Sequence, residues 1–157
     1  MRETAGMTNR RDLLAAGAGL VVMVAWRPVP AAAAIRTEST ADAIRRFAGD
    51  AAIGSGPIHL DLPALVENGN AVTITVTVES PMTPQDHIRR IAVFNDKNPQ
   101  PNVVTIHLGP RSGRAAVTTR IRLADTQRIT AIAETSDGRY WSTSAEAIVT
   151  LAACLEG

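Results

Sequence analysis

Residues 72–78 of this 157-residue chain read VTITVTV, and this stretch decides the fold. Aliphatic and threonine side chains alternate through it without a break. Successive side chains of a β-strand point to opposite faces of a sheet, so the alternation predicts a strand with one buried and one exposed face. The turn signal Asn68-Gly69-Asn70 precedes this strand, and Pro81 and Pro84 follow it.

Similar short runs lie along the rest of the chain. Turn signals separate them, and Asp137-Gly138 is the strongest hairpin signal among these. Many short strands with frequent turns are typical of an antiparallel sandwich. We therefore predict an all-β fold, an immunoglobulin-like antiparallel β-sandwich over residues 54–151. The other predicted strands are residues 58–62, 88–94, 103–108, 115–123, 129–133 and 140–151.

A short N-terminal helix is expected before the sandwich, in residues 35–53. The pattern predicts it from Glu38 to Gly49, with Ser39 or Thr40 as the cap of its first turn and Gly49 as its end. Residues at helical spacing should form its buried face. They are Ala41, Ile44, Phe47 and Ala48.

Residues 1–34 have the pattern of an export signal rather than of a folded segment. Arg10-Arg11 precedes a small and apolar run, and a stretch rich in Pro and Ala ends near Ala34. This order is typical of a secretory signal peptide, and the apolar run is too short for a good membrane span. The paired arginines resemble the twin-arginine type, with an ordinary secretory signal as the alternative. We therefore expect a periplasmic protein without a membrane anchor.

The composition excludes some classes of partner. Hydrophobic residues make up 45% of the chain and aromatic residues only 3%, so the core should be aliphatic. The formal net charge is +1 and no run of like charge occurs, which argues against nucleic acid as the main partner. The single cysteine of an exported protein indicates a reactive thiol or an intermolecular bond, with a buried structural cysteine as the alternative.

Other chemistries find little support in the sequence. His59, His87 and His107 fall on separate predicted segments and could in principle bind a metal ion, but surface histidines are the favoured interpretation. A copper site of the cupredoxin type needs a His or Met near the cysteine, and neither follows Cys154. No Gly-x-Ser-x-Gly nucleophile motif is present. We predict no metal, no cofactor and no independent enzyme activity.

Cys154 is the strongest candidate for a functional residue. The last predicted strand ends near Leu151, and Ala152 and Ala153 then lead to the thiol. An extended chain from Leu151 to Cys154 spans about 10 Å. Terminal residues are usually poorly ordered unless they are held, so a thiol on such an arm could enter the active site of another protein. Residues 152–157 are therefore predicted to form a carrier arm.

Several stretches of the chain resemble one protein family. Together they are specific, although each alone is weak, and the resemblance extends over the signal and nearly the whole mature chain. The family is SoxY, the substrate-carrier subunit of the bacterial sulfur-oxidising (Sox) multienzyme system. The stretches are Leu65-Val66-Glu67-Asn68-Gly69-Asn70, Ser80-Pro81-Met82-Thr83, Val93-Phe94 with Asn98-Pro99, Thr119-Arg120-Ile121-Arg122-Leu123-Ala124, Thr126-Gln127, and Ala133-Glu134-Thr135-Ser136-Asp137-Gly138.

The resemblance implies a role and a set of partners. It implies a heterodimer with SoxZ, a second immunoglobulin-like subunit, and thiosulfate or sulfide as cargo. A c-type cytochrome joins thiosulfate to the terminal cysteine as a Cys-S-sulfonate adduct. A dimetal hydrolase then releases sulfate, and a dehydrogenase oxidises the remaining sulfane sulfur. Cys154 matches the carrier cysteine of the family's Gly-Gly-Cys-Gly-Gly arm.

The arm departs from the family motif. Ala152 and Ala153 stand where two glycines are expected, and Leu155 and Glu156 replace the glycines that follow, before Gly157. Because glycine has more backbone freedom than alanine, we expect a stiffer and bulkier arm. The alternative function is a non-catalytic periplasmic immunoglobulin-like binding module with an incidental cysteine.

Overall fold

The structure is a computed structural model that describes residues 38–153. The predicted signal peptide and the last four residues, Cys154 to Gly157, lie outside the described residues. Within residues 38–153, no helix is long and apolar enough to cross a membrane.

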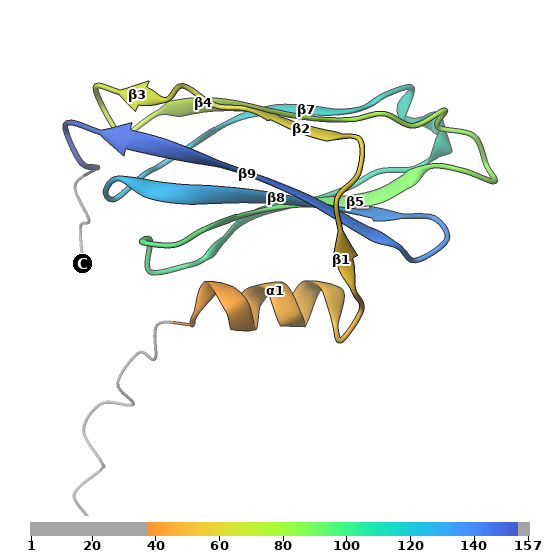
Figure 1. Cartoon of the computed structure of the whole chain (residues 1–157). Coiled ribbons are helices and arrows are strands. Elements are labelled where there is room, and N and C mark those ends of the chain that lie inside the picture. Colours follow the sequence, from red (N-terminus) through yellow and green to blue (C-terminus); the bar gives the residue numbers. More distant parts are fainter. Residues whose placement is uncertain (1–37, 154–157) are drawn as a thin grey trace, which may run out of the picture. The chain divides into compact units, whose positions relative to one another are not determined.

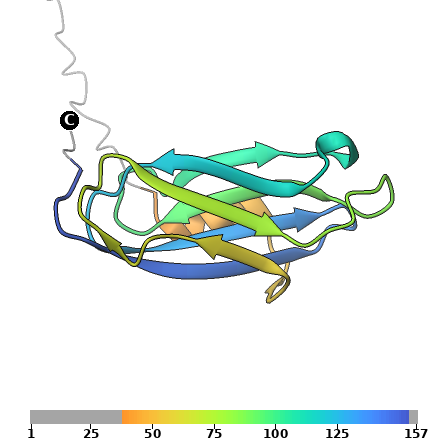
Figure 2. The ribbon, with the colours of Figure 1, turned by 90° about the horizontal axis from the view of Figure 1, so that it is seen from above.

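Two β-sheets face each other, and one helix lies on the outer side of the larger sheet (Figure 1). The strand order of the larger sheet is β1-β9-β8-β5-β6, and β3 also pairs with β9. Figure 2 shows the smaller sheet over it, with β4 between β2 and β7. The strands are β1 (Ile53–Gly54), β2 (Ile58–Asp61), β3 (Leu65–Val66), β4 (Val72–Val78), β5 (Ile88–Asn95), β6 (Asn102–His107), β7 (Ala115–Ile121), β8 (Gln127–Thr135) and β9 (Tyr140–Val149); a short 3-10 helix, η1 (Pro110–Ser112), precedes β7.

The alternating stretch forms β4, with the bounds predicted from its pattern. Its four aliphatic side chains are buried, and its threonines lie on the other face. β4 pairs antiparallel with both β2 and β7, and its buried face packs on the inner face of the larger sheet. The predicted all-β sandwich is therefore confirmed.

Two short strands differ from the prediction. β1 and β3 have two residues each, and both pair with β9 in parallel, so the larger sheet is not purely antiparallel. A strand of two residues has no measurable period, so the sequence pattern did not predict β1 or β3. β9 ends at Val149 instead of Leu151, and its pairing with β8 stops at Ala147, which lies opposite Gln127, the first residue of β8.

The predicted helix forms as α1 (Thr40–Ala48). Ser39 caps it by accepting a hydrogen bond from the Asp42 amide at 3.1 Å. Gly49 ends it with φ of 64°, a left-handed conformation that favours glycine. The predicted cap and stop signals are confirmed.

The buried face of α1 differs from the prediction in one of its residues. Ala41 is exposed, and Ala43 is buried in its place, one turn before Phe47. Phe47 packs edge to face on Phe94 of β5, with ring centroids 5.9 Å apart. Ile132 of β8 completes this cluster, so α1 covers the outer face of the larger sheet.

Candidate functional site

Backbone hydrogen bonds hold the last described residues of the chain, at the start of the predicted carrier arm. The Gly69 amide donates to the Leu151 carbonyl at 2.8 Å, and the Ala153 amide donates to the Leu123 carbonyl at 3.1 Å. Ala152 is exposed, but Ala153 has only 4% of its surface exposed. The neck, Ala152 and Ala153, is therefore anchored to the sandwich at its second residue.

A second set of contacts holds the chain just before the neck. The Thr150 amide donates to the Val66 carbonyl at 2.9 Å, and its hydroxyl donates to the Glu67 carbonyl at 3.2 Å. On the other side of β9, the Thr126 hydroxyl accepts from the Val149 amide at 3.0 Å. The end of β9 is thus fixed from both sides before the chain reaches Leu151.

Gly69 occupies a position that has no space for a side chain. A Cβ atom there would lie 2.3 Å from the Leu123 carbonyl oxygen and 2.9 Å from the Ala153 nitrogen. Both neighbours are backbone atoms, which cannot rotate away. The sequence identified Asn68-Gly69-Asn70 as a turn but gave no sign of this close approach to the neck.

We expect Gly69→Ala to loosen the neck. The inserted methyl group must displace the backbone at Leu123 or Ala153, at a cost of about 1–3 kcal/mol in the free energy of unfolding. Hydrogen exchange should show faster exchange at the Ala153 amide. Asn68→Ala is the matched control, because it removes the hydrogen bond from the Asn70 amide in the same turn without adding an atom at the contact. Unchanged protection of the Ala153 amide in the Gly69 variant would contradict this role.

A half-buried amide network supports the carbonyl that holds Ala153. The Asn98 side chain donates to the Arg122 carbonyl at 2.8 Å and accepts from the Ala124 amide at 3.0 Å. It also accepts from the Gln127 side chain at 2.9 Å. Asn98 therefore fixes the residues on both sides of Leu123. A cavity of about 340 Å³ lies against this network; its lining residues are Asn98, Pro99, Gln100, Asn102, Val103 and Arg122.

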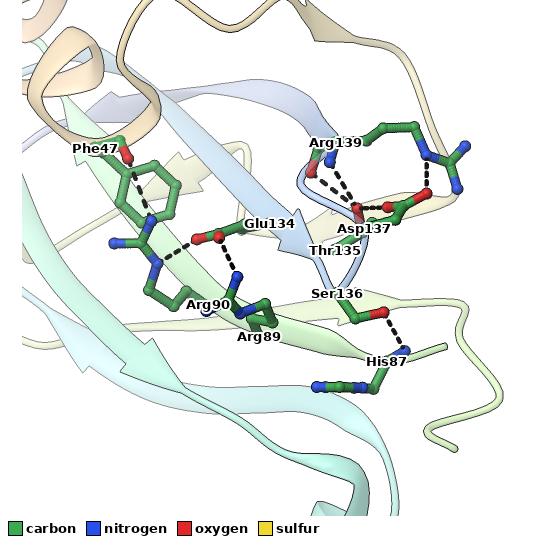
Figure 3. A network of polar contacts seen from close by, with 9 residues as sticks. All are labelled: Phe47, His87, Arg89, Arg90, Glu134, Thr135, Ser136, Asp137 and Arg139. Atoms are coloured by element: carbon green, nitrogen blue, oxygen red, sulfur yellow. Dashed lines mark hydrogen bonds and ion pairs between the residues drawn. The ribbon is translucent and has the colours of Figure 1, made fainter. Parts of the chain in front are cut away.

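A charged network lies at the other end of β8, near the hairpin (Figure 3). Glu134 is buried and pairs with Arg90 and with Arg89, the latter at 3.4 Å. The Arg90 guanidinium lies over the Phe47 ring at 4.5 Å and donates to the Phe47 carbonyl at 3.4 Å. A buried carboxylate needs such partners, so this network joins α1 to the sheet.

The predicted hairpin joins β8 to β9 beside this network. Gly138 has φ of 82°, and its amide donates to the Thr135 carbonyl at 3.0 Å, which confirms the Asp137-Gly138 turn. The Thr135 hydroxyl and the Arg139 guanidinium donate to the Asp137 carboxylate and hold its pKa below the ordinary value. These contacts close the turn at the end of the sandwich that lies away from the neck (Figure 1).

The three histidines do not gather at one place. His59 lies 3.7 Å from Glu79, and a ring nitrogen of His87 lies 3.1 Å from the Thr83 carbonyl. His87 and His107 both line an open cavity of about 440 Å³ with Arg89, Arg90, Leu108 and Glu134. Within the described part of the chain, no group of three or more His, Cys, Asp or Glu side chains could hold a metal ion.

The structure places only part of the predicted site. Ala152 and Ala153 are described, whereas Cys154, Leu155, Glu156 and Gly157 lie outside the described residues. Sequence reasoning missed the three residues that hold the neck, namely Gly69, Leu123 and Asn98. All three lie in stretches that carry the family resemblance, which was the one available signal.

Comparisons with known proteins agree with that resemblance. No curated protein sequence matches the chain. The sulfur carrier protein SoxY from Chlorobium limicola f thiosulfatophilum is similar in structure, with 28% identity, a TM-score of 0.60, and coverage of 71% of this chain and 96% of that one. A superoxide reductase (neelaredoxin) from Ignicoccus hospitalis has 18% identity, a TM-score of 0.54, and coverage of 60% of this chain and 81% of that one; this shows likeness of fold alone.

A family model also matches most of the folded chain. It is described as sulfur oxidation protein SoxY and matches residues 44–154. The matched range begins inside α1, contains all nine strands and includes Cys154. This chain therefore belongs to the SoxY family of sulfur oxidation proteins.

Proposed function

We propose that this chain is a sulfur-compound carrier that covalently holds thiosulfate-derived intermediates on Cys154. The observation that carries the proposal is the anchored neck. Ala153 is fixed to the sandwich, and Cys154 is the next residue in the chain and lies within the family match. Because Ala153 is fixed, the thiol of Cys154 can be presented to one partner protein after another from the same place on the sandwich.

The proposed carrier chemistry consists of forming an S–S bond to the cysteine and then hydrolysing the adduct. The thiolate of Cys154 and the outer sulfur of thiosulfate form an S–S bond, and the two electrons released pass to a c-type cytochrome. Water then hydrolyses the bond to the sulfonate group, so sulfate leaves and a persulfide stays on the cysteine. A dimetal hydrolase and a sulfane dehydrogenase would catalyse the later steps, and this chain would supply the thiol and its position.

The remaining parts of the proposal concern the setting. We propose export to the periplasm through the twin-arginine signal in residues 1–34, and pairing with a SoxZ-like subunit. The support is the Arg10-Arg11 pair with its apolar run, together with membership of the SoxY family. Thiosulfate is the proposed cargo, and sulfide is the alternative.

Intact mass spectrometry of protein purified from the periplasm of thiosulfate-grown host cells tests the proposal. We expect a population that is heavier by a sulfur-containing group, and peptide mapping should place the group on Cys154. Reduction with dithiothreitol should remove it, because the bond is a disulfide-type bond. An unmodified Cys154 in cells that are oxidising thiosulfate would instead favour a binding module with an incidental cysteine.

A further inference from the structure

The exposed large hydrophobic residues of the described chain are concentrated at one place. They are Leu65 at 59% exposure, Ile148 at 54% and Leu151 at 61%. Leu65 and Ile148 are register partners in the parallel pair of β3 and β9, and Leu151 follows three residues later. We name these three residues the root patch. Figure 1 shows β3 beside the end of β9, where the chain leaves the sandwich.

The core of the sandwich does not need the root patch. Val66 and Val149, the next residues along each strand, point inward and pack on the core, so the same pairing turns Leu65 and Ile148 outward. Single exposed hydrophobic residues are ordinary, but three at one place beside a functional neck are typical of an interaction site.

The length of the chain beyond the neck limits how a partner can approach. Ala153 is buried and hydrogen bonded, and Cys154 is the next residue. Because consecutive Cα atoms are about 3.8 Å apart, the Cys154 sulfur stays within about 7 Å of the Ala153 Cα atom. An enzyme that brings its reacting groups to this sulfur must therefore cover the surface around Ala153. Leu151 lies two residues before Ala153, and the Gly69 amide holds its carbonyl.

We propose that the root patch is the docking surface for the enzyme that loads thiosulfate onto Cys154, and that the entrance of its active site carries a matching apolar rim. The inference rests on the proposed function and adds the surface that a short tether requires. A long glycine arm would let a partner take the thiol at a distance from the carrier. The anchored alanine neck of this chain instead makes the surface of the sandwich part of the recognition.

Charge substitutions in the root patch test the proposal. Ile148→Lys and Leu65→Lys place a charge in the contact, and Ile148→Thr keeps a β-branched residue in case the lysine variant fails to fold. Thr73→Lys is the matched control, because Thr73 is exposed on β4 in the other sheet. Each full-length chain is expressed in host cells that lack the native gene. The fraction of Cys154 that carries an adduct is then followed by intact mass after thiosulfate is added.

We expect the root-patch variants to load about tenfold more slowly than the wild type and the Thr73 control, a change equivalent to about 1.4 kcal/mol. Purified variants should react with methyl methanethiosulfonate at the wild-type rate, since the thiol itself is unchanged. Loading at the wild-type rate would overturn the docking surface while leaving the carrier function intact.

Two further outcomes would overturn the proposal in different ways. Loss of a co-purified second subunit, or a change in self-association, would make the root patch a subunit interface instead. A wild-type chain that never carries an adduct would remove the carrier function itself, and the docking surface with it.

Discussion

Replacement of Cys154 by serine is expected to abolish thiosulfate-dependent sulfate formation in host cells. Serine has no sulfur with which to form the S–S bond, and its hydroxyl group is a weak nucleophile without an adjacent base. Loss of the carrier atom removes every later step, so we expect a fall to the background rate rather than a partial effect. The rate of sulfate release by cells that carry only the variant gene measures this fall.

The structure defines the appropriate controls for this experiment. Deletion of residues 154–157 should cause the same loss and leave the free energy of unfolding nearly unchanged, because it keeps buried Ala153 and the hydrogen bond of its amide. A deletion that begins at Ala152 would remove a buried residue and confound the two effects. Ala152→Gly, at an exposed position, should retain activity. Sulfate formation at the wild-type rate by the serine variant would disprove covalent carriage on Cys154.

Phe94→Ala is expected to cause the largest loss of stability among simple substitutions on the outer face of the larger sheet. Phe94 is 0% exposed and packs against the Phe47 ring of α1. Removing such a side chain leaves a cavity and costs about 3–5 kcal/mol. Chemical denaturation followed by circular dichroism measures the free energy of unfolding.

In the Phe94→Ala variant, the packing of α1 on the sheet should weaken more than the attachment of the neck. The cluster of Phe47, Phe94 and Ile132 is separate from the core between the sheets. Arg45 and Arg46 on α1 are exposed, so tryptic cleavage there should accelerate. The reaction of Cys154 with methyl methanethiosulfonate should keep its rate. Phe94→Leu, which retains most of the volume, should cost less than about 1.5 kcal/mol. Equal stability of the alanine variant and the wild type would show that the aromatic cluster does not hold α1.

Local patterns were sufficient to predict most of the fold. The bounds of β4 were predicted correctly because successive residues along it point alternately to the buried face and to the other face of the sheet. The helix caps were found because Ser39 and Gly49 act on backbone groups next to them in the chain. The buried face of α1 was shifted at Ala41, because small residues occur on both sides of this helix and give a weak period.

The contacts that hold the neck could not be predicted in the same way. They join residues far apart in sequence, such as Gly69, Leu123 and Ala153, and they are made between backbone atoms. Backbone hydrogen bonds leave no pattern of side-chain types. The two-residue strands β1 and β3 were missed for a similar reason, since their parallel pairing with β9 depends on the whole fold. The candidate Cys154 came from elimination and family resemblance.

The position of β9 has a mechanical consequence for a carrier that must detach from its partners. β9 lies between β8 on one side and the short strands β1 and β3 on the other. Traction on the C-terminal residues along the axis of β9 would load its inter-strand hydrogen bonds in shear, because these bonds lie across the strand. Bonds loaded together resist traction better than bonds that open one after another. If a partner pulls away while the thiol is still bound, β9 should therefore stay paired in the sheet and should not fray from its C-terminal end.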